Sequence, residues 1–75
     1  MIVPSVSRLF LARAVVDMRK SYDGLSALVL GQLGRDPMSG DAFLFVGRDR
    51  RRLKVLVWDG DGFWLFMKRL AKGRF

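Results

Sequence analysis

The stretch LKVLVWDGDGFWLFMKRL, Leu53 to Leu70, decides the fold of this chain. Its two apolar runs, 53–58 and 63–67, are rich in β-branched and aromatic residues, which are typical of strands. Between them lies the segment DGDG, residues 59–62, and Asp-Gly pairs supply the positive φ angles of tight hairpin turns. The pattern predicts a β-hairpin, and basic residues at both ends of the stretch place a basic patch where those two ends lie side by side.

Three further elements are expected before the hairpin. Residues 1–5 form a loose lead-in, and Val6–Val16 is predicted to be extended around residues 8–12, with a helix as the alternative because Leu-Ala-Arg-Ala suits one. Ser21 fits the N-cap of a helix that begins at Tyr22 and stops at Gly34. Residues 42–46 (AFLFV) read as a short strand.

The predicted order is therefore β-α-β-β-β. One helix with an apolar face and a meander of strands predict a single α+β domain over residues 1–75, a small antiparallel sheet packed on one α-helix. Strand periodicity leaves open which side chains point inward. Because residues 55–58 are apolar on both faces, the second face of the sheet could also be packed against another surface. The predicted core consists of Phe45, Val55, Val57, Leu65 and Met67 on the strands, facing Leu25, Leu28 and Val29 on the helix.

The composition points to a domain that depends on good packing or on association. A chain of 75 residues buries only about 60% of its unfolded surface, so its stability is marginal. It contains no cysteine and therefore no disulfide to stabilise it. A hydrophobic fraction of 51% suggests that some apolar surface is shared with a partner, and a homo-oligomer is one such arrangement.

The net charge of +7, from 14 Lys and Arg against 7 acidic residues, favours an anionic partner, and nucleic acid is the commonest one. The cations are densest around one predicted turn, where a charged turn exposed to solvent beside Asp49 is the alternative to phosphate contact. Nothing in this cluster predicts base-specific reading. The predicted nucleic-acid-binding residues are Arg48, Arg50, Arg51, Arg52, Lys54, Lys68 and Arg69.

The residue types that are missing argue against an enzyme. The chain has no His, Cys or Glu, so it lacks the ordinary general base near neutral pH and the soft metal ligands. We expect no catalytic residue, cofactor or metal. A metal-dependent nuclease using aspartates is a weaker alternative, because these residues suit caps and turns. No targeting or membrane-spanning segment is visible, so we expect a cytoplasmic protein without a membrane partner.

The hairpin aromatics have two possible roles. Trp58, Phe63, Trp64 and Phe66 flank the turn, and core packing is the usual role of large rings on strands. Exposed rings beside cations can instead stack on unpaired bases or dock on another protein. Both tryptophans are too large to be fully buried in so small a domain, so one of them is expected at an interface.

Four blocks of the chain resemble one protein family. They are DMRKSYDGL (17–25), RDPMSGD (35–41), RDRRRLKVLVWDGDGFWL (48–65) and KRLAKGRF (68–75). The family is TnpB, the second open reading frame of the insertion sequence sixty-six family of bacterial transposable elements. The resemblance implies an accessory protein encoded beside a separate transposase, with no catalytic residue to carry over. It also implies a C-terminal segment beyond the Gly-Arg-Phe block, which we expect this chain to lack.

The residues and the resemblance together predict a non-catalytic accessory protein for DNA transposition. It is expected to bind DNA, or a complex of DNA with the transposase of the same element, through the basic patch. The alternative is a protein–protein interaction module without direct DNA contact, whose partner is the transposase or a second copy of the chain.

Overall fold

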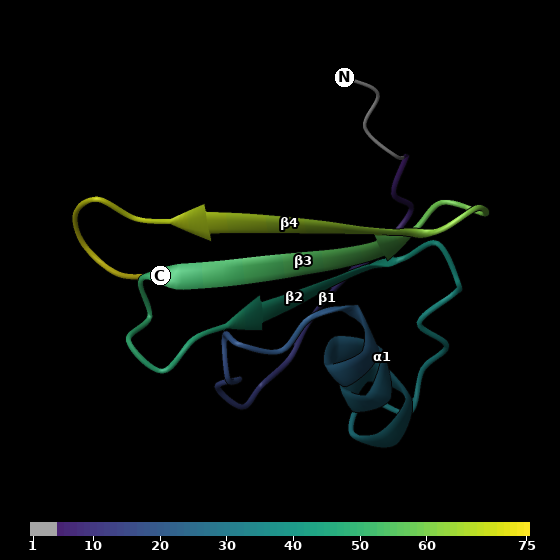
Figure 1. Cartoon of the computed structure of the whole chain (residues 1–75), viewed down its shortest axis with the longest axis horizontal. Helices are drawn as coiled ribbons and strands as arrows, with labels where there is room; N and C mark the ends of the chain where they lie inside the picture. Colours follow the sequence, from purple (N-terminus) through teal and green to yellow (C-terminus); the bar gives the residue numbers. More distant parts are fainter. Residues whose placement is uncertain (1–4) are drawn as a thin grey trace.

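The computed structural model describes residues 5–75 as a four-stranded sheet with one helix to one side of it (Figure 1). The predicted lead-in, residues 1–5, lies outside this range except for Ser5. The predicted α+β class is confirmed. In chain order the elements are β1 (Leu9–Leu11), α1 (Tyr22–Gly31), β2 (Ala42–Val46), β3 (Arg52–Trp58) and β4 (Phe63–Arg69).

The sheet is mixed, so the prediction of a purely antiparallel sheet is wrong. The strands lie in the order β1-β2-β3-β4, and only the last two pairings are antiparallel. Strand β1 pairs parallel to β2, with Phe10 opposite Phe43, because the helix between them returns the chain to the same edge in the same direction. Of the predicted extended segment 6–16 only Leu9–Leu11 forms a strand, and Val16 rejoins the sheet as a single bridge to Gly47.

The predicted hairpin is confirmed, and its turn is organised by one carboxylate. Asp59 Oδ1 accepts hydrogen bonds from the backbone N–H groups of Asp61 (2.9 Å) and Gly62 (3.0 Å). Asp59 Oδ2 accepts one from Trp64 Nε1 at 2.6 Å. Gly60 has a φ of 103°, which a residue with a side chain rarely adopts. These contacts fix the register of β3 against β4.

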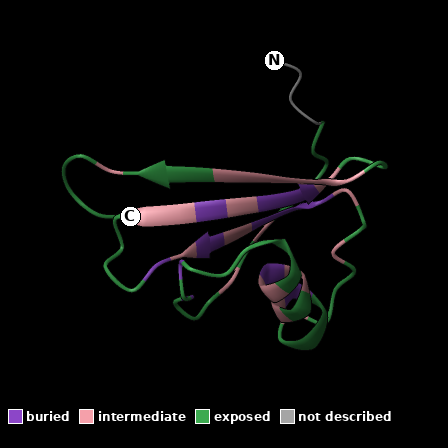
Figure 2. Cartoon of the chain, in the orientation of Figure 1, coloured by how far each residue is buried: buried purple, intermediate pink, exposed green. Residues whose placement is uncertain are grey.

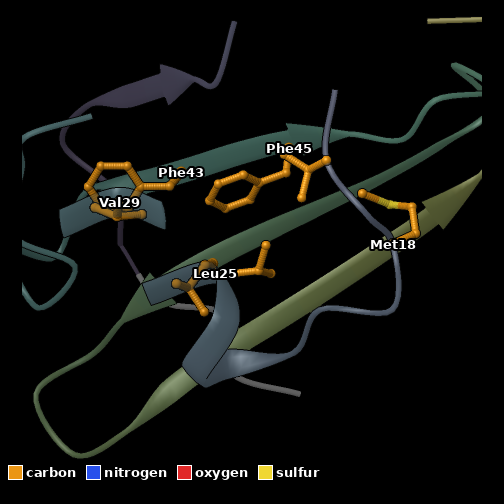
Figure 3. Close-up of a cluster of buried hydrophobic side chains, with 7 residues drawn as sticks. Met18, Leu25, Val29, Phe43 and Phe45 are labelled. Carbon is orange, nitrogen blue, oxygen red and sulfur yellow. The ribbon is translucent and has the colours of Figure 1, made fainter. Parts of the chain in front are cut away.

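The core lies between the helix and one face of the sheet (Figure 3). Leu25 and Val29 project from α1 onto Phe43 and Phe45 of β2 and Leu56 of β3, and all five side chains are fully buried. Val16 and Met18, from the segment that precedes the helix, belong to the same cluster. The predicted helix face is thus confirmed for its two central residues, while Leu28 is half-buried.

Three of the predicted strand core residues are placed differently. Phe43 pairs with Leu56, so even-numbered residues of β3 face the helix, while Val55 and Val57 point to the opposite face of the sheet. Val57 is nevertheless buried as predicted, with 1% of its surface exposed, and Val55 is half-buried. Met67 is on the helix side but is 57% exposed, because it follows Leu65 into the half of β4 that the helix does not cover (Figure 2). Phe45 is buried as predicted, and Leu65 packs half-buried against the core.

The helix ends differ in detail from the sequence prediction. Ser21 is the N-cap, but its hydroxyl makes no capping bond, and only its carbonyl accepts from Leu25 N–H at 2.9 Å. The helix ends at Gly31, before the predicted stop at Gly34. Gly34 has a φ of 62° and turns the chain so that Arg35 N–H donates to the Val29 carbonyl at 3.1 Å.

The contrast between Leu56 and Met67 is testable by alanine substitution. Leu56→Ala empties a fully buried site and should lower the free energy of unfolding by about 2–5 kcal/mol. Met67→Ala removes an exposed side chain and should change it by about 0.5 kcal/mol or less. Urea unfolding followed by tryptophan fluorescence measures both, and equal losses would contradict the assigned register.

Candidate nucleic-acid interface

Six of the seven predicted cations gather at one end of the sheet, where β2 ends, β3 begins and β4 ends. Register places Arg52 directly opposite Arg69, and Leu53 opposite Lys68. The turn from β2 to β3 is closed by Gly47 N–H donating to the Arg52 carbonyl at 2.9 Å. We call this surface the basic end; it comprises Arg48, Arg50, Arg51, Arg52, Lys68 and Arg69.

Asp49 orders the turn of the basic end. Its Oδ1 accepts from the backbone N–H of Arg51 at 3.0 Å, and its Oδ2 accepts from Arg52 Nε at 3.2 Å. The hydrogen bond from the Arg51 backbone, followed by the charge of Arg52, holds the pKa of Asp49 below its usual value. Arg50 stands in the left-handed region with a φ of 57°, which directs the chain sharply into β3.

The C-terminal residues add cations to the same end. Leu70 N–H donates to the Arg51 carbonyl at 2.7 Å, and Phe75 N–H donates to the Arg50 carbonyl at 2.6 Å. The tail therefore folds back onto the turn, with the C-terminus beside the start of β3 (Figure 1). Lys72 and Arg74, which lie outside the predicted set, are both exposed on this tail.

Lys54, the seventh predicted cation, occupies a different place. It is only 9% exposed, on the helix-facing side of β3, and its Nζ donates to the Lys20 carbonyl at 2.7 Å. A buried ammonium is costly unless it is hydrogen-bonded, and this contact fastens the segment before the helix to the sheet. Lys54 therefore stabilises the fold and offers little surface to a phosphate.

The segment 15–19 lies beside the basic end and brings in a cation that sequence reasoning missed. Asp17 and Arg19 form a forked ion pair, with Arg19 Nη2 at 2.8 Å from Asp17 Oδ2. The hydrogen bonds from Arg19 hold the pKa of Asp17 far below its usual value. Arg19, Arg48 and Arg52 line a common hollow of about 290 Å³ with this segment. The sequence gives no signal for this contact, because only folding brings residues 15–19 beside the turn at Arg48 and Arg52.

Gly47 lets this segment approach the turn. A Cβ atom built on Gly47 would lie 2.7 Å from Met18 Cγ, well inside van der Waals contact. The neighbouring bridge from Val16 to Gly47, with Val16 N–H donating to the Val46 carbonyl at 2.9 Å, holds the two strands close at this point. A glycine at position 47 therefore lets the segment 15–19 pack against the turn of the basic end.

The basic end carries mostly unpaired positive charge. Among residues 5–75 the ion pairs are Arg8–Asp41, Arg19–Asp17 and Arg52–Asp49. Within that same range, the remaining cations of the basic end have no carboxylate partner and keep their donors for an anion. Guanidinium groups bind phosphate bidentately, and such contacts carry no base information. The surface is thus suited to a phosphate backbone.

The opposite end of the sheet is acidic. The turn from β3 to β4 carries Asp59 and Asp61, both exposed. Asp41 lies just before β2 at this end and is held by Arg8 Nη2 at 2.9 Å. The domain therefore has a charge polarity along its strands. No three potential metal-ligating side chains come together within residues 5–75, and the helix they contain is too short to cross a membrane.

Comparisons with known proteins give a consistent result. Residues 7–75 match the model of a family described as IS66 Orf2-like protein. Two relatives from Sinorhizobium fredii (strain NBRC 101917 / NGR234), the uncharacterized proteins y4jC and y4hO, are 42% and 41% identical over 68 residues. That match covers 91% of this chain, and it spans 58% and 59% of those two relatives. No solved structure matches the chain.

The tight contact at Gly47 predicts an energetic coupling with Met18. Gly47→Ala should lower the free energy of unfolding by about 1–3 kcal/mol, because the new methyl group overlaps Met18 Cγ. In a Met18→Ala background the same substitution should cost clearly less. Chemical denaturation of the four proteins of this double-mutant cycle measures the coupling, and strict additivity would contradict the contact.

The Asp49 turn predicts a pH dependence with a defined sign. Its pKa is lower in the folded chain than the ordinary value of 3.8, so the turn is fully stabilised above about pH 5 and loses this stabilisation as pH falls through the lowered pKa. The Arg51 amide resonance should report the loss by NMR. Asp49→Asn should remove this titration, whereas Asp61→Asn, at the other end of the hairpin, should leave it unchanged.

Proposed function

The chain belongs to the IS66 Orf2-like family, which implies an accessory role in transposition, and from this premise we propose that it binds DNA through the basic end. The ligand is the DNA of the mobile element, free or in complex with the element's transposase. The protein acts in the cytoplasm, where that DNA is found. Its contribution is to hold DNA without catalysing strand chemistry.

The observation that carries this proposal is the convergence of cations from separate parts of the chain. Three segments meet at the basic end: the β2–β3 turn, the end of β4 and the C-terminal tail. The backbone hydrogen bonds of Leu70 and Phe75 join them. Clustered Lys and Arg displace condensed counterions from a nucleic acid backbone, which is the main source of sequence-independent affinity. The acidic opposite end disfavours DNA and so sets the orientation of the protein on it.

The arrangement of the cations supports contact along a backbone. Arg52 and Arg69 form a cross-strand pair on the helix side of the sheet, and Lys68 points to the other side. Like charges directly opposite each other destabilise a sheet, and a polyanion relieves that repulsion. The end of the sheet thus presents positive charge on both of its sides to one phosphate chain.

The aspartates support a role without catalysis. Asp17 and Asp41 are engaged by arginines, and Asp49 and Asp59 accept backbone N–H bonds in their turns. Asp36 likewise accepts from Met38 N–H at 2.8 Å. Carboxylates used in this way hold the chain in place, and each accepted hydrogen bond stabilises the charged form and weakens the group as a general base.

A second candidate function is a protein–protein interaction module, with the transposase or a second copy of the chain as partner. The observation that favours it is the apolar character of the sheet face turned away from the helix. Both functions are compatible in one molecule, because that face and the basic end are different surfaces.

The proposal predicts DNA binding that weakens steeply with salt. If about four phosphates are contacted, affinity for a short duplex from an element end should fall about a hundredfold between 50 and 200 mM salt. Fluorescence anisotropy with a labelled duplex measures this fall. Absence of binding at low salt, or affinity that is indifferent to salt, would refute phosphate contact.

Matched substitutions locate the contact. Arg50→Ala and Lys68→Ala remove cations of the basic end and should each reduce the slope of log affinity against log salt by about 1. Arg35→Ala removes one charge as well, but Arg35 lies over the Phe10 ring, away from the basic end, and should leave the slope unchanged. Equal effects of all three would mean that only net charge matters.

A further inference from the structure

The sheet has a second apolar face. Side chains alternate along a strand, so the residues next to Phe43 and Leu56 in sequence point away from the helix. Register aligns Leu44, Val55 and Phe66 in one row across three strands, and β1 continues the row with Leu11. We call this surface the outer face and define it by Leu9, Leu11, Leu44, Val55, Trp64 and Phe66.

Much of the outer face is open to solvent. Leu9 and Leu11 are 63% and 56% exposed, and the other residues that define the face are half-buried. Ala42 and Val57 lie on the same side at the end near Asp59, where they are 4% and 1% exposed. The Trp64 and Phe66 rings lie parallel, with centroids 5.7 Å apart, and extend the apolar surface over β4. The single helix of residues 5–75 packs on the other side (Figure 1). Continuous apolar surface of this kind marks an interaction site.

We propose that a second copy of the chain packs on the outer face, with its strands antiparallel to those of the first. Charge complementarity along the strands favours this arrangement. The basic end lies at one extremity of the sheet, and the turn with Asp59 and Asp61 lies at the other. A two-fold axis in the plane between the sheets, perpendicular to the strands, sets each basic end over the acidic turn of the partner. The parallel arrangement would place the two basic ends together, at a cost in repulsion.

The size of the face sets the strength of the dimer. Four strands about 4.8 Å apart, the shortest of three residues and the longest of seven, make a face roughly 20 Å on a side. Two such faces would bury on the order of 1,000 Å² in total, at the low end of specific interfaces. The charge of +7 on each copy opposes association, but the basic ends are far apart in the antiparallel dimer and salt screens them. The dimer should therefore form reversibly, depending on protein concentration.

The dimer rests on the second candidate function and is independent of DNA contact. If the first proposal also holds, the dimer presents its two basic ends at opposite extremities. One dimer can then hold two DNA segments together. A monomer with one basic end has no such capacity.

Sedimentation equilibrium over concentrations from about 1 µM to about 1 mM tests the dimer. The mass should rise toward that of two chains, and added salt should not abolish the rise, because most of the contact is apolar. Leu44→Lys places a charge in the middle of the outer face and Leu11→Lys places one on its β1 side, and each should weaken association at least tenfold. Leu30→Lys is the matched control, since Leu30 is 66% exposed on α1 and lies outside the face.

Circular dichroism establishes whether each variant is folded. If Leu44→Lys does not fold, Leu11→Lys still tests the dimer, because Leu11 is already exposed and its replacement leaves the core intact. A wild-type chain that stays monomeric at about 1 mM, or equal effects of Leu11→Lys and Leu30→Lys, would overturn the proposal. A monomer whose outer face binds only the transposase would also overturn it. If the wild-type chain dimerises but binds no DNA in the anisotropy assay, the DNA-binding proposal is refuted and the dimer proposal stands.

Discussion

The structure depends on one register, in which Phe43, Leu56 and Leu65 stand side by side on neighbouring strands. Since strand side chains alternate, a slip of one residue would turn every one of them to the other face. The turn at residues 59–62 prevents the slip on one side of β3, because the Asp59 carboxylate binds two backbone N–H groups and the Trp64 indole together. The helix then has a single apolar surface on which Leu25 and Val29 can be buried.

The same register arranges charge as well as apolar surface. It places Arg52 opposite Arg69, a repulsive pair that burial of the core does not require. The nearby turn is ordered by Asp49, whose carboxylate accepts hydrogen bonds from the Arg51 backbone N–H and from Arg52 Nε. Two like charges held opposite each other beside a well-ordered turn suit a surface that binds an anionic partner. The apolar outer face is a different surface with different chemistry.

Much of this fold could be predicted from local signals, and the failures have a common cause. The hairpin followed from Asp-Gly chemistry, and Leu25 and Val29 followed from helical spacing. The direction of Val55 and Val57 was wrongly predicted because residues 55–58 are apolar on both faces, so periodicity gave no inward direction. Met67 does lie on the helix side, but the helix does not cover its half of β4. The parallel pairing of β1 was missed because its partner strand follows a helix and lies far along the chain: Phe10 pairs with Phe43, 33 residues later. Lys54 was predicted to lie on the binding surface but supports the fold, and Arg19 reaches the basic end although no role was predicted for it. Both placements depend on contacts between distant parts of the chain.

The sequence by itself determined the elements whose causes are local: the turn-forming glycines and aspartates, the helix with its apolar stripe, and the density of arginine between residues 48 and 52. It also carried the family, because whole blocks of residues are enough to identify one. Tertiary structure alone decided which face of the sheet meets the helix, that the Lys54 ammonium binds the Lys20 carbonyl, and that the C-terminal tail lies on the basic turn. These contacts join residues far apart in the chain, and their energies depend on a burial and a register that exist only once the chain has folded.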